Sequence, residues 1–512
     1  LFFSNDCYIL NTLFFKNKLW IWLFISLLVL WFAYPILRVG YFLISDPIPE
    51  EQVFTLTETL IDDASRLNQS THLGIIKLSP DLNQSIATLR DTLKRAQIKK
   101  QKVIPLGARH SMGKQSIGRD AIHIDLSAMN KMGMEDGLLR VQAGARWREV
   151  LRYLAPLGLS VEVMQSNADF SIGGTLSVNA HGWQPDRPPV SSTVEMLSLI
   201  DANGEVLLCS RAKNAELFKH VLGGYGLMGI IIEVWIRPVP NEILRSSHTI
   251  VECQNFSSEW NRMKEGPVRL AYARLSVAPS TFFKQILLSS YQTTGEISNQ
   301  AAQYEITSKT SLARAIFRAS LNSDRGKSFR QWMENLIGGE AGGVHSRANL
   351  LIEPVRIFTN NDSDKTDILV EIFIPQEKFS DFMPLARELM INQSSSLLNV
   401  TIREISRDSD TALPYATQDM FGLVMLFTID RRKEAEEILH LKISTLIDLA
   451  LKYGGTFYLP YRNYANSEQI KKAYPTLENF ISTKQQHDPS ETFVSDFYYY
   501  LLQSTDQKNV RP

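Results

Sequence analysis

Three glycine-rich segments constrain the fold of this chain more than any other feature of its sequence. They lie at residues 107–113, 171–182 and 223–229, the first after an apolar run at 103–106 and the third before one at 230–236. Glycine leaves backbone amides uncovered, so such segments can lie against a phosphate or a flat ring. Each segment alone is also compatible with an ordinary turn. Three of them in order, separated by helices and strands, predict one extended ligand that passes along several loops.

Length and composition place the chain among folded proteins with more than one domain. It has 512 residues, of which 44% are hydrophobic and 21% charged, and this length exceeds what one core usually serves. Lys and Arg together number 54, as do Asp and Glu, so no net basic charge favours nucleic acid as a partner. The cysteines and histidines lack the spacing of metal ligands or of a disulfide framework. We therefore expect no metal site.

The order of apolar patterns predicts an α+β protein that divides near residue 240. Between residues 75 and 240, short strand-like runs alternate with helical patterns such as 83–98, where apolar residues recur on one face. Residues 241–453 then alternate long helical stretches with strand candidates, which predicts a second α+β domain. The last segment, residues 454–512, is predicted to return to the first domain.

The N-terminal segment, residues 1–45, is predicted to carry a membrane anchor. Residues 19–37 include no charged side chain and would span roughly 28 Å as a helix. Trp20, Trp22 and Tyr34 suit the two membrane interfaces. A cleaved signal peptide is the alternative, but its shorter apolar core and small-residue cleavage site are not evident. We expect a single-pass membrane protein whose main part lies outside, on a small excess of Lys and Arg before the helix.

As a set, the motifs resemble the FAD-binding domain of the vanillyl-alcohol oxidase superfamily. The resemblance rests on Gly-Ala-Arg-His-Ser at 107–111, Ser-Ile-Gly-Gly at 171–174, Gly-Gly-Tyr-Gly-Leu-Met-Gly-Ile at 223–230, and a closing segment with Tyr474-Pro475, Lys484, Asp488-Pro489, Phe493 and Ser495-Asp496. It is greatest for the branch of sugar-lactone oxidases, alditol oxidases and decaprenylphosphoryl-ribose oxidase. The Arg-His-Ser-Met-Gly variant is also similar to a group of bacterial FAD-linked oxidoreductases. The implied fold is a two-subdomain PCMH-type FAD-binding domain with an α+β cap domain.

The resemblance implies FAD as the cofactor, held by residues of the glycine-rich segments and their neighbours. These residues are Gly107, Ala108, Arg109, His110, Ser111, Met112, Gly113, Gln115, Ser166, Gly173, Gly174, Ser177, Ala180, His181, Gly229 and Ile231. In this family a histidine at the position of His110 is often joined to the flavin 8-methyl group, since a neutral imidazole can attack that carbon. A histidine that only contacts a non-covalently held flavin is the alternative. For His181, a flavin contact and a hydrogen-bonded place in the core both stay open.

The resemblance also implies a cap-domain strand with the motif Glu-Ile-Arg in the substrate site. Residues 400–407 read Val-Thr-Ile-Arg-Glu-Ile-Ser-Arg, so Glu404 matches the glutamate while the arginine is displaced. Glu404 and Arg407 are therefore predicted to act on the substrate, although a surface ion pair is the alternative for Glu404. Strand alternation places Glu404 on one face, and Arg403 and Arg407 on the other. Tyr461 stands where relatives carry a lysine, and either orienting the substrate or packing under the flavin is open to it.

The function implied by the resemblance is that of a membrane-anchored, FAD-dependent oxidoreductase. It would oxidise a hydroxyl group of a sugar, alditol or aldonolactone, as D-arabinono-1,4-lactone oxidases do, by hydride transfer to FAD. Oxygen, a quinone or a cytochrome would then reoxidise the flavin, and the bacterial inner membrane, on its periplasmic side, is the expected location. The alternatives are an FAD-dependent reductase of a lipid or sterol double bond, an epimerase component like decaprenylphosphoryl-ribose oxidase, and a flavin-binding protein without activity.

Overall fold

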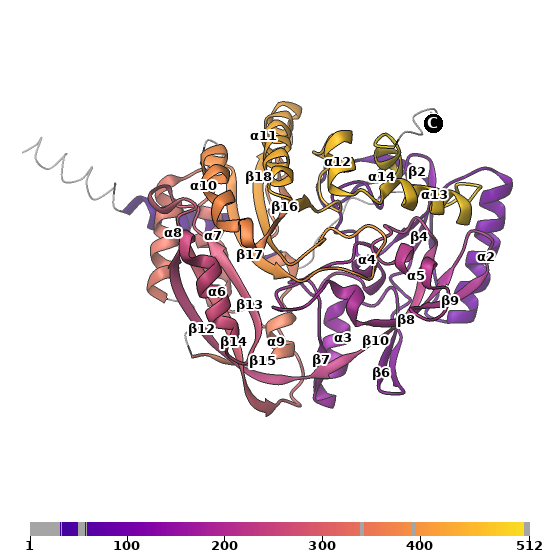
Figure 1. The fold of residues 1–512 in the computed structure, drawn as a ribbon, viewed down its shortest axis with the longest axis horizontal. Coiled ribbons are helices and arrows are strands. Elements are labelled where there is room, and N and C mark those ends of the chain that lie inside the picture. The colour runs from indigo at the N-terminus through magenta and orange to yellow at the C-terminus, as the bar shows by residue number, and fades with distance from the viewer. Residues whose placement is uncertain are drawn as a thin grey trace, which may run out of the picture.

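The fold is built on two groups of strands, one from residues up to Pro240 and one from residues after it (Figure 1). We call these two parts of the chain the first half and the second half. The computed structural model describes residues 31, 33–49, 57, 59–337, 342–391 and 395–505. Strands and helices occur in both halves, so the prediction of an α+β protein is confirmed.

The first half contains two sheets. The smaller has the order β1-β2-β4-β3, formed by Leu60–Ile61, Ser70–Lys77, Ala121–Asp125 and Val103–Leu106. The larger has the order β5-β6-β10-β8-β9, formed by Met132–Glu135, Leu138–Gln142, Ile230–Ile236, Val194–Ile200 and Val206–Ser210. Its strands are antiparallel, and every residue of β10 is buried. Strands β7 (Leu159–Val161) and β11 (Pro238–Pro240) form a separate antiparallel pair, and the second half begins directly after β11.

The helices of the first half pack through apolar residues that recur along one face of each helix. Helix α2 (Leu82–Ile98) starts at Asp81, whose side chain accepts a hydrogen bond from the backbone of Gln84 at 2.9 Å, a normal N-cap contact. It buries Leu89 and Leu93 on one face, as the sequence predicted. The other helices of this half are α3 (Trp147–Leu154), α4 (Ile172–Ser177) and α5 (Ala215–Val221).

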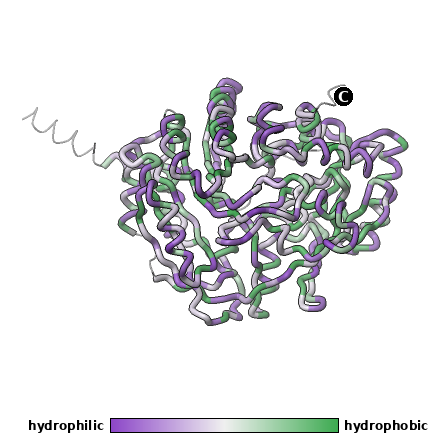
Figure 2. Tube along the Cα trace, viewed as in Figure 1, coloured by the Kyte–Doolittle hydropathy of each residue, from purple (hydrophilic) through white to green (hydrophobic). Residues whose placement is uncertain are grey.

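An eight-stranded sheet dominates the second half, in the order β15-β12-β14-β13-β17-β18-β16-β19. Its strands are Val344–Ser346, Glu242–Glu252, Gln285–Ile297, Val268–Leu275, Leu397–Ile405, Met420–Asp430, Lys365–Pro375 and Thr456–Phe457. Its helices are α6 (Phe256–Lys264), α7 (Ser308–Ala319), α8 (Asp324–Ile337), α9 (Arg347–Leu351), α10 (Phe379–Met390) and α11 (Lys433–Lys452). Figure 2 shows hydrophobic and hydrophilic residues intermixed along most of these elements, as expected where each has one buried side.

The C-terminal segment contacts both halves. Strand β19 adds to the edge of the large sheet beside β16. Helix α12 (Ser467–Ala473) lies beside α11, where Nε2 of Gln469 donates to Asp448 at 2.8 Å. Helices α13 (Leu477–His487) and α14 (Asp496–Leu502) then lie with the first half in Figure 1. The N–H of Val103 donates to the carbonyl of Thr492 at 2.7 Å, and the N–H of Asp496 to that of Ile117 at 2.8 Å. These bonds tie the last segment to residues on both sides of the first glycine cluster, Val103 before it and Ile117 after it.

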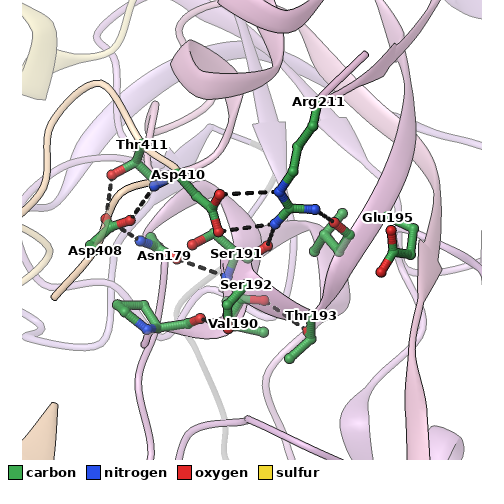
Figure 3. Close-up of polar contacts among 12 residues, drawn as sticks. Asn179, Val190, Ser191, Ser192, Thr193, Glu195, Arg211, Asp408, Asp410 and Thr411 are labelled. Carbon is green, nitrogen blue, oxygen red and sulfur yellow. Dashed lines mark hydrogen bonds and ion pairs between the residues drawn. The ribbon is translucent and has the colours of Figure 1, made fainter. Parts of the chain in front are cut away.

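A loop of the second half, between β17 and β18, is anchored on the first half (Figure 3). The side chain of Asn179 donates to Asp408 at 2.9 Å and accepts from the backbone of Ser191 at 3.0 Å. Arg211 donates to both carboxylate oxygens of Asp410, at 3.1 and 2.9 Å. Asp408 is 4% exposed, and burial raises its pKa. This loop therefore fixes the end of β17 against the second glycine cluster.

Most of the predicted membrane helix lies outside the described residues, which begin at Trp31. Residues 33–45 are helical, and the guanidinium of Arg38 donates to the carbonyls of Ala319 and Leu321 at 2.7 and 2.6 Å. Among the described helices, none has the length and apolar character needed to cross a bilayer.

Candidate functional site

A cavity lies where the three glycine clusters meet the second half and the C-terminal segment. Its lining includes residues 107–111, five residues of 171–177, and Gly226 and Gly229 of the third cluster. Glu371 and Arg403 come from the large sheet, and Tyr461 from the segment after β19. The loops thus form one continuous wall, as expected for a single extended ligand. We call this space the loop cavity.

Two of the glycines are required by the local geometry. A Cβ on Gly107 would lie 2.2 Å from the Oγ of Ser171, and the same Oγ accepts a hydrogen bond from the backbone of Ala108 at 3.2 Å. Gly229 has a φ of +148° and would place a Cβ 2.5 Å from the carbonyl of Ile200. The bare backbone therefore lets the clusters approach one another closely, and it suits the diphosphate and flat ring of FAD.

Most of the predicted FAD-binding residues line the loop cavity. They are Gly107, Ala108, Arg109, His110, Ser111, Gln115, Gly173, Gly174, Ser177, Ala180, His181, Gly229 and Ile231. Met112 and Ser166 line a second cavity instead. Gly113 is in neither lining; a Cβ there would lie 2.3 Å from the carbonyl of Tyr461, so it packs against the C-terminal segment.

His110 lies on the boundary between the two cavities and lines both. Its ring centroid is 4.4 Å from that of Phe170, with the planes tilted by 33°. Burial lowers the pKa of His110 to about 4, with Asp169 acting in the opposite direction. The imidazole is therefore neutral near pH 7, which is the form that can act as a nucleophile.

His181 lines the loop cavity and also makes a buried contact with the carboxyl group of Glu371. Its Nε2 lies 2.6 Å from Oε1 of Glu371, and the two side chains are 5% and 1% exposed. The rings of Phe373, Tyr415 and Tyr458 surround the imidazole, with centroids 5.6 to 5.9 Å away. His181 therefore has the hydrogen-bonded place in the core that the sequence left open, with its Nδ1 also 3.3 Å from the carbonyl oxygen of Gly182, while contact with a flavin stays a prediction.

The second cavity adjoins the first, and the large sheet forms one of its walls. It has a volume of about 780 Å³, within the usual range for ligand sites. Tyr272, Arg274 and Tyr291 contribute from β13 and β14, and Asn399, Thr401 and Arg403 from β17. His110, Phe170 and Arg403 belong to both linings. We call this space the sheet cavity.

The structure places Glu404 on the other face of β17, so its prediction as a substrate contact is wrong. Glu404 is buried and accepts from the indole of Trp260 at 2.8 Å, from Lys264 at 2.6 Å and from Gln376 at 2.9 Å. Successive side chains of a strand point to opposite faces, and the residues of β17 that line the sheet cavity are the odd-numbered Asn399, Thr401 and Arg403.

Arg407 also lies away from both cavities. The strand ends at Ile405, and Arg407 is an exposed residue whose backbone N–H donates to Asp419 at 2.9 Å. Arg403, and not Arg407, lines the two cavities. Thr401, two residues before Arg403 and on the same face of β17, lines the sheet cavity as well.

Tyr461 does line the loop cavity, near Glu371 and Arg403. Burial raises the pKa of its hydroxyl, Glu371 acts in the same direction, and Arg403 opposes them. The hydroxyl therefore stays protonated at neutral pH and can donate a hydrogen bond.

Glu371 and Arg403 were missed as site residues. Glu371 interrupts the apolar run 368–374. This signal could have identified it, because a buried carboxylate is costly unless it is paired or hydrogen-bonded. Arg403 sits opposite Gly422 in the register of β17 and β18. A Cβ on Gly422 would lie 3.0 Å from Oε1 of Glu371, so this glycine leaves room beside the two charged groups.

The comparisons with known proteins agree with this geometry. Residues 82–210 match a family described as an FAD binding domain. The D-arabinono-1,4-lactone oxidases of Candida glabrata and Saccharomyces cerevisiae are 26% and 24% identical over 186 residues, 35% of this chain and of each relative. Cytokinin dehydrogenase 3 of Oryza sativa subsp. japonica is 31% identical over 183 residues, 34% of each chain. The match thus spans about a third of these relatives, and the prediction of FAD as the cofactor is confirmed.

Proposed function

Because the chain carries an FAD-binding domain of the vanillyl-alcohol oxidase superfamily, we propose that it is an FAD-dependent oxidoreductase acting on CH–OH groups. The substrate class is a sugar, alditol or aldonolactone. One observation carries the proposal: the sheet cavity adjoins the loop cavity at His110, Phe170 and Arg403. A molecule in the sheet cavity would therefore reach the cofactor.

When bound in the loop cavity, FAD supplies an acceptor for the hydride that leaves the substrate carbon. Glu371 provides an oxygen that takes the hydroxyl proton, so that the carbon–oxygen bond becomes a carbonyl. Arg403 orients the substrate oxygen and stabilises the negative charge that develops on it. Tyr461, protonated at neutral pH, donates a hydrogen bond to the same region.

His110 positions the cofactor in this proposal. Its neutral imidazole lies at the cavity boundary beside Phe170, where it would join the flavin 8-methyl group covalently. The lactone substrate class draws support from the D-arabinono-1,4-lactone oxidases among the relatives. Oxygen, a quinone or a cytochrome would be the final electron acceptor.

We also propose that residues 19–37 anchor the protein to a membrane, the bacterial inner membrane, with the main part on the periplasmic side. The charge-free segment supports this, and Arg38, directly after it, is held by the carbonyls of Ala319 and Leu321 at the end of α7. An anchored protein would stay with the membrane fraction after alkaline washing. Release by that wash would contradict the anchor and leave the enzymatic proposal intact.

Anaerobic reduction of the flavin tests the proposed reaction. The purified protein is mixed with aldonolactones, alditols and sugars, and loss of the oxidised flavin absorbance is followed. We expect bleaching with at least one hydroxylated compound and recovery with oxygen, a quinone or a cytochrome. Bleaching by NADPH alone, without any alcohol, would instead support a reductase of a double bond.

A further inference from the structure

The sheet cavity is rich in hydrogen-bond donors that have no protein acceptor. Among the described residues, five lining side-chain nitrogens are buried without a hydrogen-bond partner: Asn167 Nδ2, Trp183 Nε1, Arg274 Nε, Asn360 Nδ2 and Arg403 Nε. Among the described residues that line the sheet cavity, no side-chain oxygen is buried without a hydrogen-bond partner. Buried donors without acceptors are costly, so the lining favours a ligand that brings oxygen acceptors.

Trp183 packs between two tyrosines in the wall of the sheet cavity. Its side chain is 7% exposed, and its rings contact those of Tyr272 and Tyr291 edge to face, with centroids 5.5 and 5.4 Å apart. These contacts fix the indole plane, and with it the direction of the N–H bond.

Arg274 adds positive charge to the same wall. It pairs in register with Thr401 of β17, and its Nη1 donates to Oε1 of Glu334 at 2.8 Å. The same carboxylate oxygen accepts from Nε of Arg330 at 2.7 Å. The single carboxylate of Glu334 thus pairs with the guanidinium groups of both Arg274 and Arg330. It can neutralise only one of their two positive charges, so a positive charge remains beside the cavity.

The acidic residues of the lining do not cancel this charge. Asp367 accepts from both Nη1 and Nη2 of Arg318, and from the hydroxyl of Thr428 at 2.6 Å. Burial raises the pKa of Glu353 to about 7, with Arg274 opposing the shift. Glu353 is therefore protonated in a large fraction of molecules near neutral pH, and it can then donate a hydrogen bond.

We propose that the sheet cavity selects substrates that carry an anionic group, a carboxylate or a phosphate, in addition to the hydroxyl that is oxidised. Trp183 and Arg274 hold the anion, while the hydroxyl lies toward Arg403 at the boundary with the loop cavity. This inference rests on the proposed function, and it narrows the substrate class from neutral sugars and lactones to acidic or phosphorylated ones. Arg and Trp N–H groups suit the oxygens of both anions.

Matched pairs of compounds test the proposal on the flavin-loaded protein. Xylitol is compared with xylonate, and ribitol with ribitol 5-phosphate, by kcat/KM for flavin reduction and by calorimetric Kd. We expect one anionic member to exceed its neutral partner at least about tenfold, which corresponds to about 1.4 kcal/mol. The pair with the larger ratio tells a carboxylate site from a phosphate site.

Two variants locate the anion site. Trp183→Phe retains an aromatic ring between the two tyrosines and removes the N–H, and Arg274→Gln removes the positive charge. Each should lower the ratio of kcat/KM for the anionic member of a pair to kcat/KM for its neutral member about tenfold or more. Arg269→Gln is the matched control, because Arg269 lies on the same strand, is exposed and pairs with Glu242.

Equal kcat/KM and Kd for the neutral and anionic members of both pairs would overturn the inference. An anion preference that survives unchanged in Trp183→Phe and in folded Arg274→Gln protein would do so as well. If no hydroxylated compound reduces the flavin, the proposed function fails instead. The calorimetric comparison still decides the anion preference in that case, since it needs no turnover.

Discussion

Nε2 of His181 lies 2.6 Å from Oε1 of Glu371 in an almost fully buried pair. His181 belongs to the second glycine cluster of the first half, and Glu371 to β16 of the large sheet. The contact therefore joins the two halves at the wall of the loop cavity. It also holds the carboxylate that we propose as the proton acceptor.

Glu371→Ala should destabilise the protein by about 1–3 kcal/mol, because it leaves a buried imidazole without its partner. The free energy of unfolding in denaturant measures this loss. Glu377→Ala is the control, since the Glu377 side chain is 74% exposed and should change stability by less than about 0.5 kcal/mol. Equal stability of the two variants would contradict the role given to the pair.

Arg403→Gln should lower kcat/KM for the oxidised substrate by about 10²-fold, because it removes the cation beside the reacting oxygen. Arg407→Gln should leave kcat/KM nearly unchanged, since Arg407 is exposed and outside both cavities. Steady-state kinetics of the two variants decide between the structure and the prediction from sequence. A larger loss in Arg407→Gln than in Arg403→Gln would refute this assignment.

His110→Ala should release the flavin when the protein is precipitated with acid, whereas the wild-type precipitate should stay yellow and fluorescent in a gel. Since burial lowers the pKa of His110 to about 4, the imidazole is unprotonated above that pH. His110 therefore stays neutral between pH 6 and 8, and the rate of covalent attachment to added FAD should change little in that range. The rate should fall as the pH drops toward about 4, where the imidazole becomes protonated. Flavin that wild-type protein releases in acid would show non-covalent binding.

Asp488→Asn should destabilise the protein by about 3–5 kcal/mol, because Lys484 and Asp488 form an ion pair with both side chains fully buried. Asp488 also accepts from the backbone of Thr492 and Phe493 at 2.9 and 2.8 Å. The control is Glu437→Gln, which breaks a pair of the same i,i+4 spacing with Lys433 whose side chains are 84% and 59% exposed. That pair should contribute about 0–1 kcal/mol, and a similar loss in both variants would contradict the account.

The loop cavity was largely predictable from sequence because its determinants are local. Glycine clusters, their neighbouring strands and His110 are read from short segments, and their backbone requirements do not depend on distant pairing. Met112 and Ser166 show the limit of this reasoning. Met112 lies within the first glycine-rich segment and Ser166 lies five residues before the second, yet both line the neighbouring cavity.

The sheet cavity was not predictable in the same way, because distant strands form its wall. Arg274, Thr401 and Val424 meet only through the register of β13, β17 and β18. Neighbouring residues of a strand point to opposite faces, and a motif match alone chose Glu404, although the adjacent residue, Arg403, is the one on the cavity face. Asp408 shows the same dependence on distant pairing, because Asn179 of the first half is the residue against which it is buried.

The flavin content of the purified protein tests the central claim most directly. We predict one FAD per chain by absorbance and mass spectrometry, and a marked loss of FAD in Gly107→Val, whose side chain would collide with Ser171. Protein that is folded, carries no flavin and takes up none from added FAD would contradict the account.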